Sequence, residues 1–600
     1  MLLPLSLSAQ PAIFPNGIVS AASYLSPGSP GGALAQGSIF TIFGNSLGPA
    51  APGAQASGFP LSPTLAGVSV RVVHQTGQTL PALPLFVSAT QINAILPSTT
   101  PIGLVLLSVL YEGRASNAEP VKVVRSSFGI FARNSGGSGR AVAQNAVSAT
   151  ELPLNSPETP AVPGDIVVLW GTGLGPAESD QVRPQPAERS EPLEILVAGR
   201  PAAVLYRGRS GCCAGVDQIN MRLPPETPSG CAVPVVVQVN GLYSNLVTLA
   251  IGPGGRPCQD SWSPPGGARR WGEIVLTRAG GSDLVDAVFA EGEAAAGLPP
   301  PGTCASSGPL PAAGLDAGAQ LSLAGPQGMR QIPRQGPGRY RLASTGSSPF
   351  LGAGVYGLSG PGGADVGPFQ TSLTAAAFPA WGNPSGTRDR GVTMGWTGAT
   401  AGEALLAAGG PGFVCAAIPG SGSFTIPPEV LANAPAQVSL TLDAMFRTNF
   451  TSPGLDFAVL RYADSTSRGV NLGDPPLAAS PVRLPNGQTI VAELAATAPE
   501  RQRGLMQRSQ LASDRGMLFL FDRPDFYPFW MYRTVIPLDI IWLDSNRRIV
   551  FVSPDTPPCR SEDSRQCPTY GGREVAQYVL EVAAGVAARQ GLRVGDRLEW

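Results

Sequence analysis

"GSIFTIFGNSLGPA" at residues 37–50 and "GDIVVLWGTGLGPA" at residues 164–177 are two versions of one segment. Seven of their fourteen positions are identical. The segments "TQINAILP" (90–97) and "DQINMRLP" (217–224) are separated along the chain by the same offset as the first pair. Matching blocks in one register indicate two copies of one domain.

A third block and the strand pattern support this repeat. Ser-Asn dipeptides at 116–117 and 244–245 keep the same offset to within one position. The runs "IFTIF" and "IVVLW" are rich in β-branched and aromatic residues and stop at glycine, which is typical of strands that end in turns. We therefore predict two immunoglobulin-like β-sandwiches, over residues 10–126 and 127–252.

Four motifs of the second copy carry a family resemblance. They are "NSPETPAVPGD", "GTGLGPAES", "DQINMRLP" and "GLYSNLVTLAI". They resemble a repeat found in large secreted bacterial proteins and are similar to immunoglobulin-like domains of the IPT/TIG type. The resemblance covers roughly residues 14–252 and implies a spacer or adhesion role rather than catalysis.

The segment "GNSLG" (44–48) fits the G-x-S-x-G pattern of a hydrolase nucleophile, but its context does not. That pattern needs a following helix and a histidine partner, whereas "GPAAPG" follows here and the other copy has "GTGLG". A tight glycine turn is the better interpretation. His74 stands at a strand end before a turn, where we expect it to face solvent.

Composition excludes several classes of function. The 600 residues include 75 Gly and 62 Pro, which favour many short strands and turns over long helices. Net charge is −1 with no basic stripe, so we expect no nucleic-acid partner. Lys122 is the only lysine and His74 the only histidine, which rules out a Walker A motif and a multi-histidine zinc site. The chain has no apolar run of about 18 residues, so we expect no membrane span.

The eight cysteines favour disulfides and an oxidising compartment, because their number is even and none forms a C-x-x-C motif. We expect Cys304 to pair with Cys415 and Cys559 with Cys567. For the others, we expect one of the adjacent cysteines, Cys212 or Cys213, to bond Cys231 and the second to reach Cys258; the sequence leaves the choice open.

The first nine residues, "MLLPLSLSA", are typical of the end of a signal peptide, with an apolar stretch followed by small residues. We interpret residues 1–9 as a signal-peptide remnant. Together with the cysteine usage, this predicts a secreted, cell-surface or periplasmic protein.

Residues 253–480 alternate short apolar runs with Gly, Pro and Ser, which predicts one or two further β-sandwich units. Trp381 and Trp396 would either line a sugar-binding face or belong to the core, and the core is the better interpretation. We find no catalytic constellation in this region.

Residues 481–600 have a different pattern. Asn486-Gly487 predicts a hairpin turn, and Thr497 with Glu500 forms a capping box that starts a helix. We expect about six strands and two short helices in a small barrel-like α+β domain. The whole chain is thus predicted to be a mostly β, multi-domain protein.

Long motifs of this domain carry a second resemblance. "ERQRGLMQR", "GMLFLF", "FWMYRTVIPLDIIWLD" and "YVLEVAAGVAARQGLRVGD" resemble domain-of-unknown-function family 192, also called uncharacterised protein family 0127. The family motif W-M-x-N-T-x-x-P-L-D is matched except that Tyr532-Arg533 replaces the usual Lys-Asn. The resemblance implies no established reaction, and members are often exported.

The candidate ligand-binding residues lie in these motifs. Arg503, Thr534 and Asp539 would line a cleft, or form a buried network in which Arg503 or the Thr534 hydroxyl donates to Asp539. Trp530 belongs to the same motif. Met506, Met517 and Met531 would either bind a soft metal such as Cu(I) or fill the core. We assign no catalytic residue, metal or cofactor, since without His or Lys here only a carboxylate with a strongly shifted pKa could exchange protons.

These observations predict an exported, non-enzymatic multi-domain β protein. Its repeats would act as spacers or adhesive surfaces that display a C-terminal domain for a ligand, an extracellular protein or a polysaccharide. The alternative is that the C-terminal domain is an enzyme or a copper-binding module on a β stalk.

Overall fold

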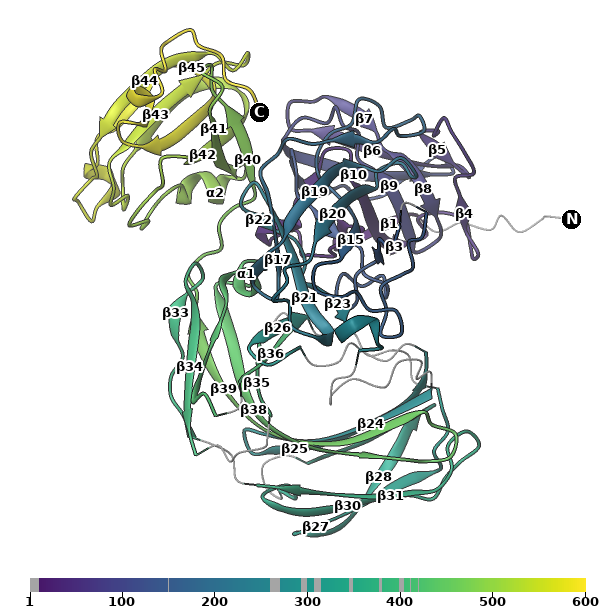
Figure 1. Ribbon diagram of the computed structural model, residues 1–600. Coiled ribbons are helices and arrows are strands. Elements are labelled where there is room, and N and C mark those ends of the chain that lie inside the picture. Colours follow the sequence, from purple (N-terminus) through teal and green to yellow (C-terminus); the bar gives the residue numbers. More distant parts are fainter. Residues whose placement is uncertain are drawn as a thin grey trace, which may run out of the picture.

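The computed structural model describes residues 10–148, 150–258, 270–292, 299–306, 314–344, 349–376, 380–398, 404–409, 412–418 and 420–600. The predicted signal-peptide remnant, residues 1–9, lies outside them. The described chain is mostly β and is organised in several sheets (Figure 1). None of the helices in these ranges has the length and apolar character that a membrane-spanning segment needs.

The first repeat is a sandwich of two sheets around one apolar core. One sheet has the order β1–β3–β9–β8–β4; in the other, β2–β12–β10–β6–β5, strand β11 also pairs with β10 and β7 with β6. The bounds are β1 Ala12–Ser20, β2 Leu34–Ala35, β3 Ile39–Asn45, β4 Ala54–Gln55, β5 Thr64–Leu65, β6 Val68–His74, β7 Thr79–Pro81, β8 Leu83–Val87, β9 Gln91–Ile95, β10 Gly103–Tyr111, β11 Arg114–Ala115 and β12 Glu119–Val124.

The second repeat is also a two-sheet sandwich with its own core. Its sheets have the orders β13–β15–β20–β19–β16, with β14 on β15, and β18–β17–β21–β22, with β23 on β21. The bounds are β13 Gly129–Ile130, β14 Ala143–Asn145, β15 Ile166–Thr172, β16 Ala187–Glu188, β17 Leu193–Val197, β18 Arg200–Pro201, β19 Ala203–Arg209, β20 Asp217–Arg222, β21 Gly230–Val239, β22 Leu242–Tyr243 and β23 Val247–Ile251.

Matching side chains make the same hydrogen bonds in both repeats. The Asn117 side chain accepts from the backbone N–H of Ile13 at 2.8 Å, and Asn245 accepts from Ile130 at 2.8 Å. In each Ser-Asn dipeptide the serine hydroxyl also bonds the preceding strand. The internal repeat read from the sequence is therefore a structural repeat.

The glycine loop "GTGLG" is held by a buried carboxylate. Asp217 accepts hydrogen bonds from the backbone N–H groups of Gly173 and Leu174, both at 2.8 Å. Its other oxygen lies 3.0 Å from the guanidinium of Arg209, and both side chains are buried. Arg209 also donates to the carbonyl of Gly37, so this ion pair joins the second repeat to the first.

The disulfide prediction for the second repeat was wrong. Cys231 bonds Cys258, while Cys212 and Cys213 are free and exposed. The reason is the position of the strands: Cys231 is in β21, which pairs with β23, and the chain after β23 brings Cys258 to 5.3 Å between Cα atoms. The adjacent cysteines follow β19, which belongs to the opposite sheet. Elsewhere Cys304 bonds Cys415 and Cys559 bonds Cys567.

The middle region contains a 12-stranded sheet of order β26–β36–β35–β38–β39–β24–β25–β29–β28–β27–β30–β31 and a small sheet of order β32–β34–β33, with β37 on β34. Trp381 and Trp396 are buried in its core. The bounds are β24 Arg270–Ala279, β25 Ser282–Glu291, β26 Thr303–Ser306, β27 Gln320–Gly325, β28 Gly328–Gly336, β29 Arg339–Ser344, β30 Gly354–Gly360, β31 Phe369–Ala375, β32 Ala380–Trp381, β33 Ser385–Thr387, β34 Gly391–Thr397, β35 Ala404–Gly409, β36 Phe413–Ala416, β37 Ser423–Ile426, α1 Pro428–Leu431, β38 Gln437–Phe450 and β39 Phe457–Asn471.

The C-terminal domain is a six-stranded sheet of order β40–β41–β42–β45–β43–β44 with two short helices. The predicted capping box is present: Thr497 and Glu500 bond each other's backbone at the start of α2. The bounds are β40 Ala479–Arg483, β41 Thr489–Ala495, α2 Ala498–Arg503, β42 Arg515–Trp530, β43 Leu538–Leu543, β44 Ile549–Thr556, β45 Thr569–Ala583 and α3 Val586–Arg589.

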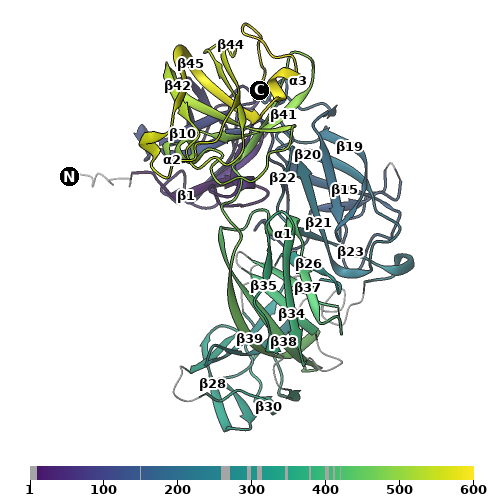
Figure 2. The same cartoon turned by 90° about the vertical axis from the view of Figure 1, so that its left-hand side faces the viewer.

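The C-terminal domain packs against the first repeat, beside the two sandwiches in Figures 1 and 2. Ile102 and Val124 of the first repeat belong to the same buried cluster as Leu518 and Leu580 of the C-terminal domain. At the edge of this interface the only lysine, Lys122, forms an ion pair with Glu500 at 2.6 Å.

His74 lies at the same interface and is only 6% exposed, so the expectation that it faces solvent was wrong. Its Nε2 lies 3.2 Å from the carbonyl of Ile102, and its Nδ1 2.8 Å from the Thr76 hydroxyl. A Cβ added at Gly103 would lie 3.1 Å from His74 Nε2 and 3.4 Å from Leu520, which shows how the C-terminal domain covers this strand end. Burial lowers the pKa of His74.

Candidate functional site

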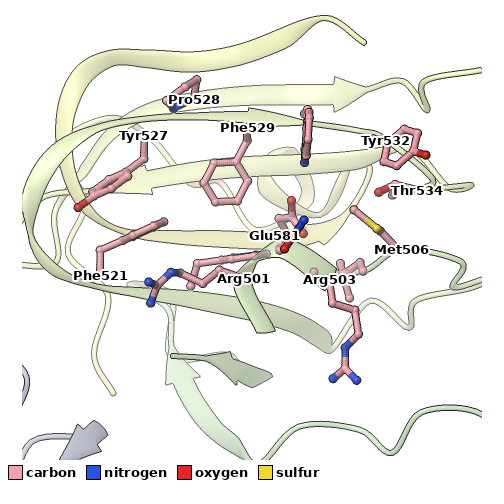
Figure 3. A pocket seen from close by; sticks show the side chains of 15 residues that line it. Arg501, Arg503, Met506, Phe521, Tyr527, Pro528, Phe529, Tyr532, Thr534 and Glu581 are labelled. Carbon is pink, nitrogen blue, oxygen red and sulfur yellow. The ribbon is translucent and has the colours of Figure 1, made fainter. Parts of the chain in front are cut away.

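A pocket of about 240 Å³ opens in the C-terminal domain between α2 with its following turn and the second half of β42. Figure 3 shows Glu581 in the middle, with Phe521 and Tyr527 at one end and Met506 and Tyr532 at the other. The pocket takes its aromatic lining from six side chains, Phe519, Phe521, Tyr527, Phe529, Trp530 and Tyr532.

Irregularities in β42 create this aromatic wall. The strand is 16 residues long, and its register against β45 shifts between Leu520 and Asp525 and again between Phe526 and Pro528. In its second half the side chains therefore no longer alternate regularly between the two faces of the sheet. Opposite Pro528, Gly571 has φ 64°, and a Cβ there would lie 2.3 Å from the Trp542 ring, so only glycine allows the approach.

Glu581 is the one acidic side chain that lines this pocket in the described chain. It stands in the central strand β45, directly opposite Met517 and Ile540, and it shares their face of the sheet. The residue is 4% exposed, and its carboxyl has no hydrogen bond or ion pair within the part of the chain that the structure describes. Burial raises the pKa of Glu581 to about 8, so it is mostly protonated at pH 7.

A second glutamate in the same row of the sheet shows what Glu581 lacks. Glu493 stands opposite Met517 from the other side. Its carboxylate forms an ion pair with Arg508 at 2.6 Å and accepts from the backbone N–H of Leu477 at 2.8 Å. Glu493 is thus a satisfied structural acid, whereas Glu581 is left available to a ligand.

The two arginines that line the pocket do not neutralise Glu581. Arg501 donates to the carbonyls of Ala496 at 2.6 Å and Leu520 at 2.9 Å, and its guanidinium lies 5.0 Å from the Phe521 ring centre. Arg503 pairs with Asp474 at 3.5 Å. In Figure 3 its guanidinium points away from Glu581.

The structure brings four of the predicted ligand-binding residues to this pocket and leaves three outside its lining. Arg503, Met506, Trp530 and Thr534 line it. Met517 and Met531 are buried in the small apolar cluster beneath it. The three methionines therefore do not line one site, and the described residues contain no group of three or more His, Cys, Asp or Glu side chains that could hold a metal ion.

Asp539 has a structural role, and the expectation that Arg503 or Thr534 donates to it was wrong. It is fully buried and accepts from two backbone N–H groups, those of Asp555 and Ala587, each at 2.8 Å. These bonds tie the end of β44 and the start of α3 to β43. Backbone donors satisfy the carboxylate, so no side-chain partner is needed.

Sequence reasoning missed Glu581 and most of the aromatic wall. The available signal was the run "YVLEVA" (578–583), where one acid interrupts an apolar strand. A strand covered on both faces is apolar at almost every position, so a lone acid there marks an unusual site. The wall could not be read in this way, because the register shifts of β42 decide which aromatics face the pocket.

Comparisons with known proteins agree with the C-terminal resemblance. Residues 482–600 match the model of a family described as DUF192, Uncharacterized ACR, COG1430. No curated protein matches the chain.

Two solved structures are similar in sequence to about a fifth of this chain. A protein of unknown function from Novosphingobium aromaticivorans DSM 12444 is 37% identical, with 21% of this chain and 86% of that chain covered and a TM-score of 0.19. A putative transcription regulator from Sinorhizobium meliloti 1021 is also 37% identical, with 21% and 97% covered and a TM-score of 0.19.

Another solved structure covers more of the chain at lower identity. A tetra-tandem repeat from the extending region of a large adhesion protein is 12% identical, with 73% of this chain and 97% of that chain covered and a TM-score of 0.12, which is too low to assign the repeats to a family. Residues 482–600 therefore form a domain of the uncharacterized family DUF192.

Proposed function

We propose that this chain is an exported, non-enzymatic multi-domain β protein whose C-terminal domain binds a small uncharged ligand in the Glu581 pocket. The observation that carries the proposal is the buried carboxyl of Glu581, which lacks a partner in the described chain and lies in an aromatic-lined pocket. Pockets with apolar walls and a few polar groups are the usual form of small-molecule sites.

The charges around the pocket favour an uncharged ligand. Arg501 and Arg503 on the lining would repel a cation. Glu581 would repel an anion whenever its carboxyl is ionised. A protonated Glu581 both donates and accepts hydrogen bonds, as does the hydroxyl of Thr534. Together with flat aromatic faces, these groups suit a ring that has one apolar face and several hydroxyl groups, such as a sugar.

The same lining argues against hydrolysis of a glycosidic bond. Canonical glycoside hydrolases use two carboxyl groups, and Glu581 is the one acid on the pocket lining of the described chain. The C-terminal domain also contains neither His nor Lys. Binding without reaction is the simpler role.

A second candidate function is proton transfer by Glu581. The observation that favours it is the pKa of about 8, which is close to the pH at which a general acid or base works best. In this case a bound ligand would be converted, and a Glu581→Gln variant would bind it without converting it.

The remaining domains are proposed to act as spacers. The resemblance of the two repeats to IPT/TIG-type domains supports this role for residues 14–252, and the three disulfides support export to an oxidising compartment. The docking of the C-terminal domain on the first repeat would hold its pocket in a fixed orientation.

The test is saturation-transfer NMR of the full chain with a panel of neutral monosaccharides and small polyols. We expect at least one to bind, with affinity reduced tenfold or more by Trp530→Ala. The matched control is Phe526→Ala on the same strand, where the aromatic side chain is 55% exposed and outside the pocket lining.

Two results would contradict the proposal. One is that no neutral member of the panel binds. The other is that Trp530→Ala and Phe526→Ala have the same effect on affinity. Conversion of the bound molecule by wild-type protein, lost in Glu581→Gln, would establish the second candidate instead.

A further inference from the structure

A larger cleft, of about 550 Å³, lies where the C-terminal domain meets the second repeat. The C-terminal domain contributes the β40–β41 hairpin and the last residues of the chain, including Arg597 and Trp600. The second repeat contributes the loop at Glu191 and the turn at Asn240. In Figure 1 the chain end lies on the side of the C-terminal domain that faces the repeats.

This cleft carries an excess of positive charge. Four arginines and two glutamates line it, namely Arg125, Arg483, Arg547, Arg597, Glu191 and Glu599. Arg125 pairs with Glu191 at 3.1 Å. Arg547 donates to the carbonyl of Trp600 at 2.8 Å, and its guanidinium lies 4.7 Å from the centre of the Trp600 ring.

The guanidinium groups of Arg483 and Arg597 have no ion pair or hydrogen bond within the described ranges of the chain. Their backbones are nevertheless fixed. Arg483 and Glu599 exchange backbone hydrogen bonds of 2.7 and 3.1 Å in an isolated β-bridge, and Arg597 forms another such bridge with Arg548. The cleft thus holds two exposed arginines without an ion-pair partner, beside one acid, Glu599, that also forms no ion pair in the described chain. A planar guanidinium is well suited to bind carboxylate or phosphate oxygens.

An unsatisfied acceptor lies on the opposite wall. Asn240 is 2% exposed, and its amide nitrogen donates to Ser126 at 2.7 Å. Its Oδ1 atom is buried and has no hydrogen-bond partner in the described chain. A buried carbonyl oxygen without a donor is costly, so a hydroxyl donor from a bound molecule would stabilise it.

From these observations we infer that the cleft is a binding site for a hydroxylated organic anion, of the type of an acidic sugar. Arg483 and Arg597 bind the anionic group, and Asn240 Oδ1 accepts from a hydroxyl group of the same molecule. The shared chemistry is an anion next to hydroxyl groups, which a uronic acid or a sugar phosphate both provide. None of these residues lines the Glu581 pocket, so the site is independent of the proposed function.

The experiment is calorimetric titration of the full chain at low salt with digalacturonate, glucose 6-phosphate, neutral digalactose and inorganic phosphate as separate probes. We expect binding of digalacturonate or glucose 6-phosphate that weakens with salt, because exposed charges are screened. The comparison of these two probes decides between a carboxylate and a phosphate.

The variants localise the binding. Arg483→Gln/Arg597→Gln should weaken it tenfold or more, and Arg483→Lys/Arg597→Lys should restore part of it because the charge returns. Arg573→Gln, an exposed arginine outside the cleft, is the matched control. Glu581→Gln should leave this binding unchanged, which separates it from the pocket.

The inference is overturned if neither hydroxylated anion binds, or if digalactose binds as well as digalacturonate and glucose 6-phosphate. It also fails if inorganic phosphate binds as tightly as glucose 6-phosphate while digalacturonate does not bind, since the hydroxyl contact would then contribute nothing. Equal affinities of the double Gln variant and of Arg573→Gln place the anion elsewhere and overturn it too.

Discussion

The position of Glu581 in strand β45 determines the pKa of its carboxyl group. Its neighbours across the sheet are Met517 and Ile540, so the carboxyl lies against apolar side chains with no cation beside it. Its pKa rises from 4.5 to about 8 through burial. The folded domain therefore holds a proton that the unfolded chain releases above pH 4.5.

This proton predicts how stability depends on pH. The contribution of Glu581 is fully present below pH 4.5 and is lost as pH rises to about 8, a change of about 5 kcal/mol at roughly 1.4 kcal/mol per pH unit, of which about 4 kcal/mol falls between pH 5 and pH 8. Glu581→Gln, which cannot ionise, should gain stability relative to wild type by that amount between pH 5 and pH 8. Hydrogen exchange of β45 amides in the two proteins, compared at each pH, measures it; parallel pH profiles would contradict the pKa assignment.

Asp217 is a second buried acid, but unlike Glu581 its carboxyl has several partners. It is paired with Arg209 and holds two backbone N–H groups of the glycine loop. Removing one partner of a buried pair typically costs about 3–5 kcal/mol. We expect Asp217→Ala to destabilise the second repeat by that amount in urea unfolding, while Asp563→Ala, in the exposed pair with Arg565, has no measurable effect. If Asp217→Ala lowers the free energy of unfolding no more than the control does, the glycine loop does not depend on Asp217 for its stability.

At the scale of elements, α2 forms one wall of the pocket although it has only six residues. A helix this short depends on its cap and on packing. Thr497→Ala removes a capping bond and should cost about 1 kcal/mol. Because the turn after α2 carries Leu505 and Met506 to the pocket, the same change should also weaken ligand binding. Exchange of the backbone amides that follow α2 measures the first effect, with Thr569→Ala on an exposed strand end as control.

Local signals predicted the elements of this chain well, and contacts between distant segments were harder to predict. The capping box, the Asn486-Gly487 hairpin and the two repeats follow from short-range patterns, and all are present. The Cys231–Cys258 bond was missed because it depends on which strands share a sheet. His74 was misplaced because the C-terminal domain, at the far end of the sequence, covers it.

The candidate site was predicted in part for the same reason. Thirteen of the fifteen lining residues lie in the motif blocks of this domain, but only four of them were named as candidates. Glu581 and Phe529 reach the pocket through the pairing and register of β42 with β45, which no single segment encodes. Asp539 is buried, as one of the two alternatives for it required, but its partners are backbone groups that sequence patterns do not reveal.

At the scale of the whole molecule, the C-terminal domain and the first repeat share one apolar cluster. The single lysine of the chain closes its edge, where Lys122 donates to Glu500 at 2.6 Å and to the carbonyl of Leu494 at 3.0 Å. Asn433 of the middle region accepts from the backbone N–H of Gly31 at 2.9 Å and donates to the carbonyl of Tyr243 at 3.1 Å, so it contacts both repeats.

The rate of chemical labelling of Lys122 reports whether this interface is closed. We expect an amine-reactive ester to label it slowly in the native chain and at least ten times faster in Ile102→Glu, which places a charge in the shared cluster. Mass spectrometry of the Lys122 peptide measures the rate, and the terminal amino group of the chain is the internal reference. Leu106→Glu, at a residue of the same repeat that is 44% exposed, is the control and should leave the rate unchanged. Equally fast labelling of the native chain would mean that the two domains separate freely.

The pairing of strands in the middle region has a mechanical consequence if the chain acts as the proposed spacer. Its first long strand, β24, and its last, β39, run parallel side by side, from Trp271 opposite Phe457 to Ala279 opposite Ser465. A pulling force on the ends of this region would slide the two strands past each other and load all their hydrogen bonds together, instead of peeling them apart one by one. The region would thus resist tension as a shear clamp, and the strands folded between β24 and β39 would be protected until that clamp breaks.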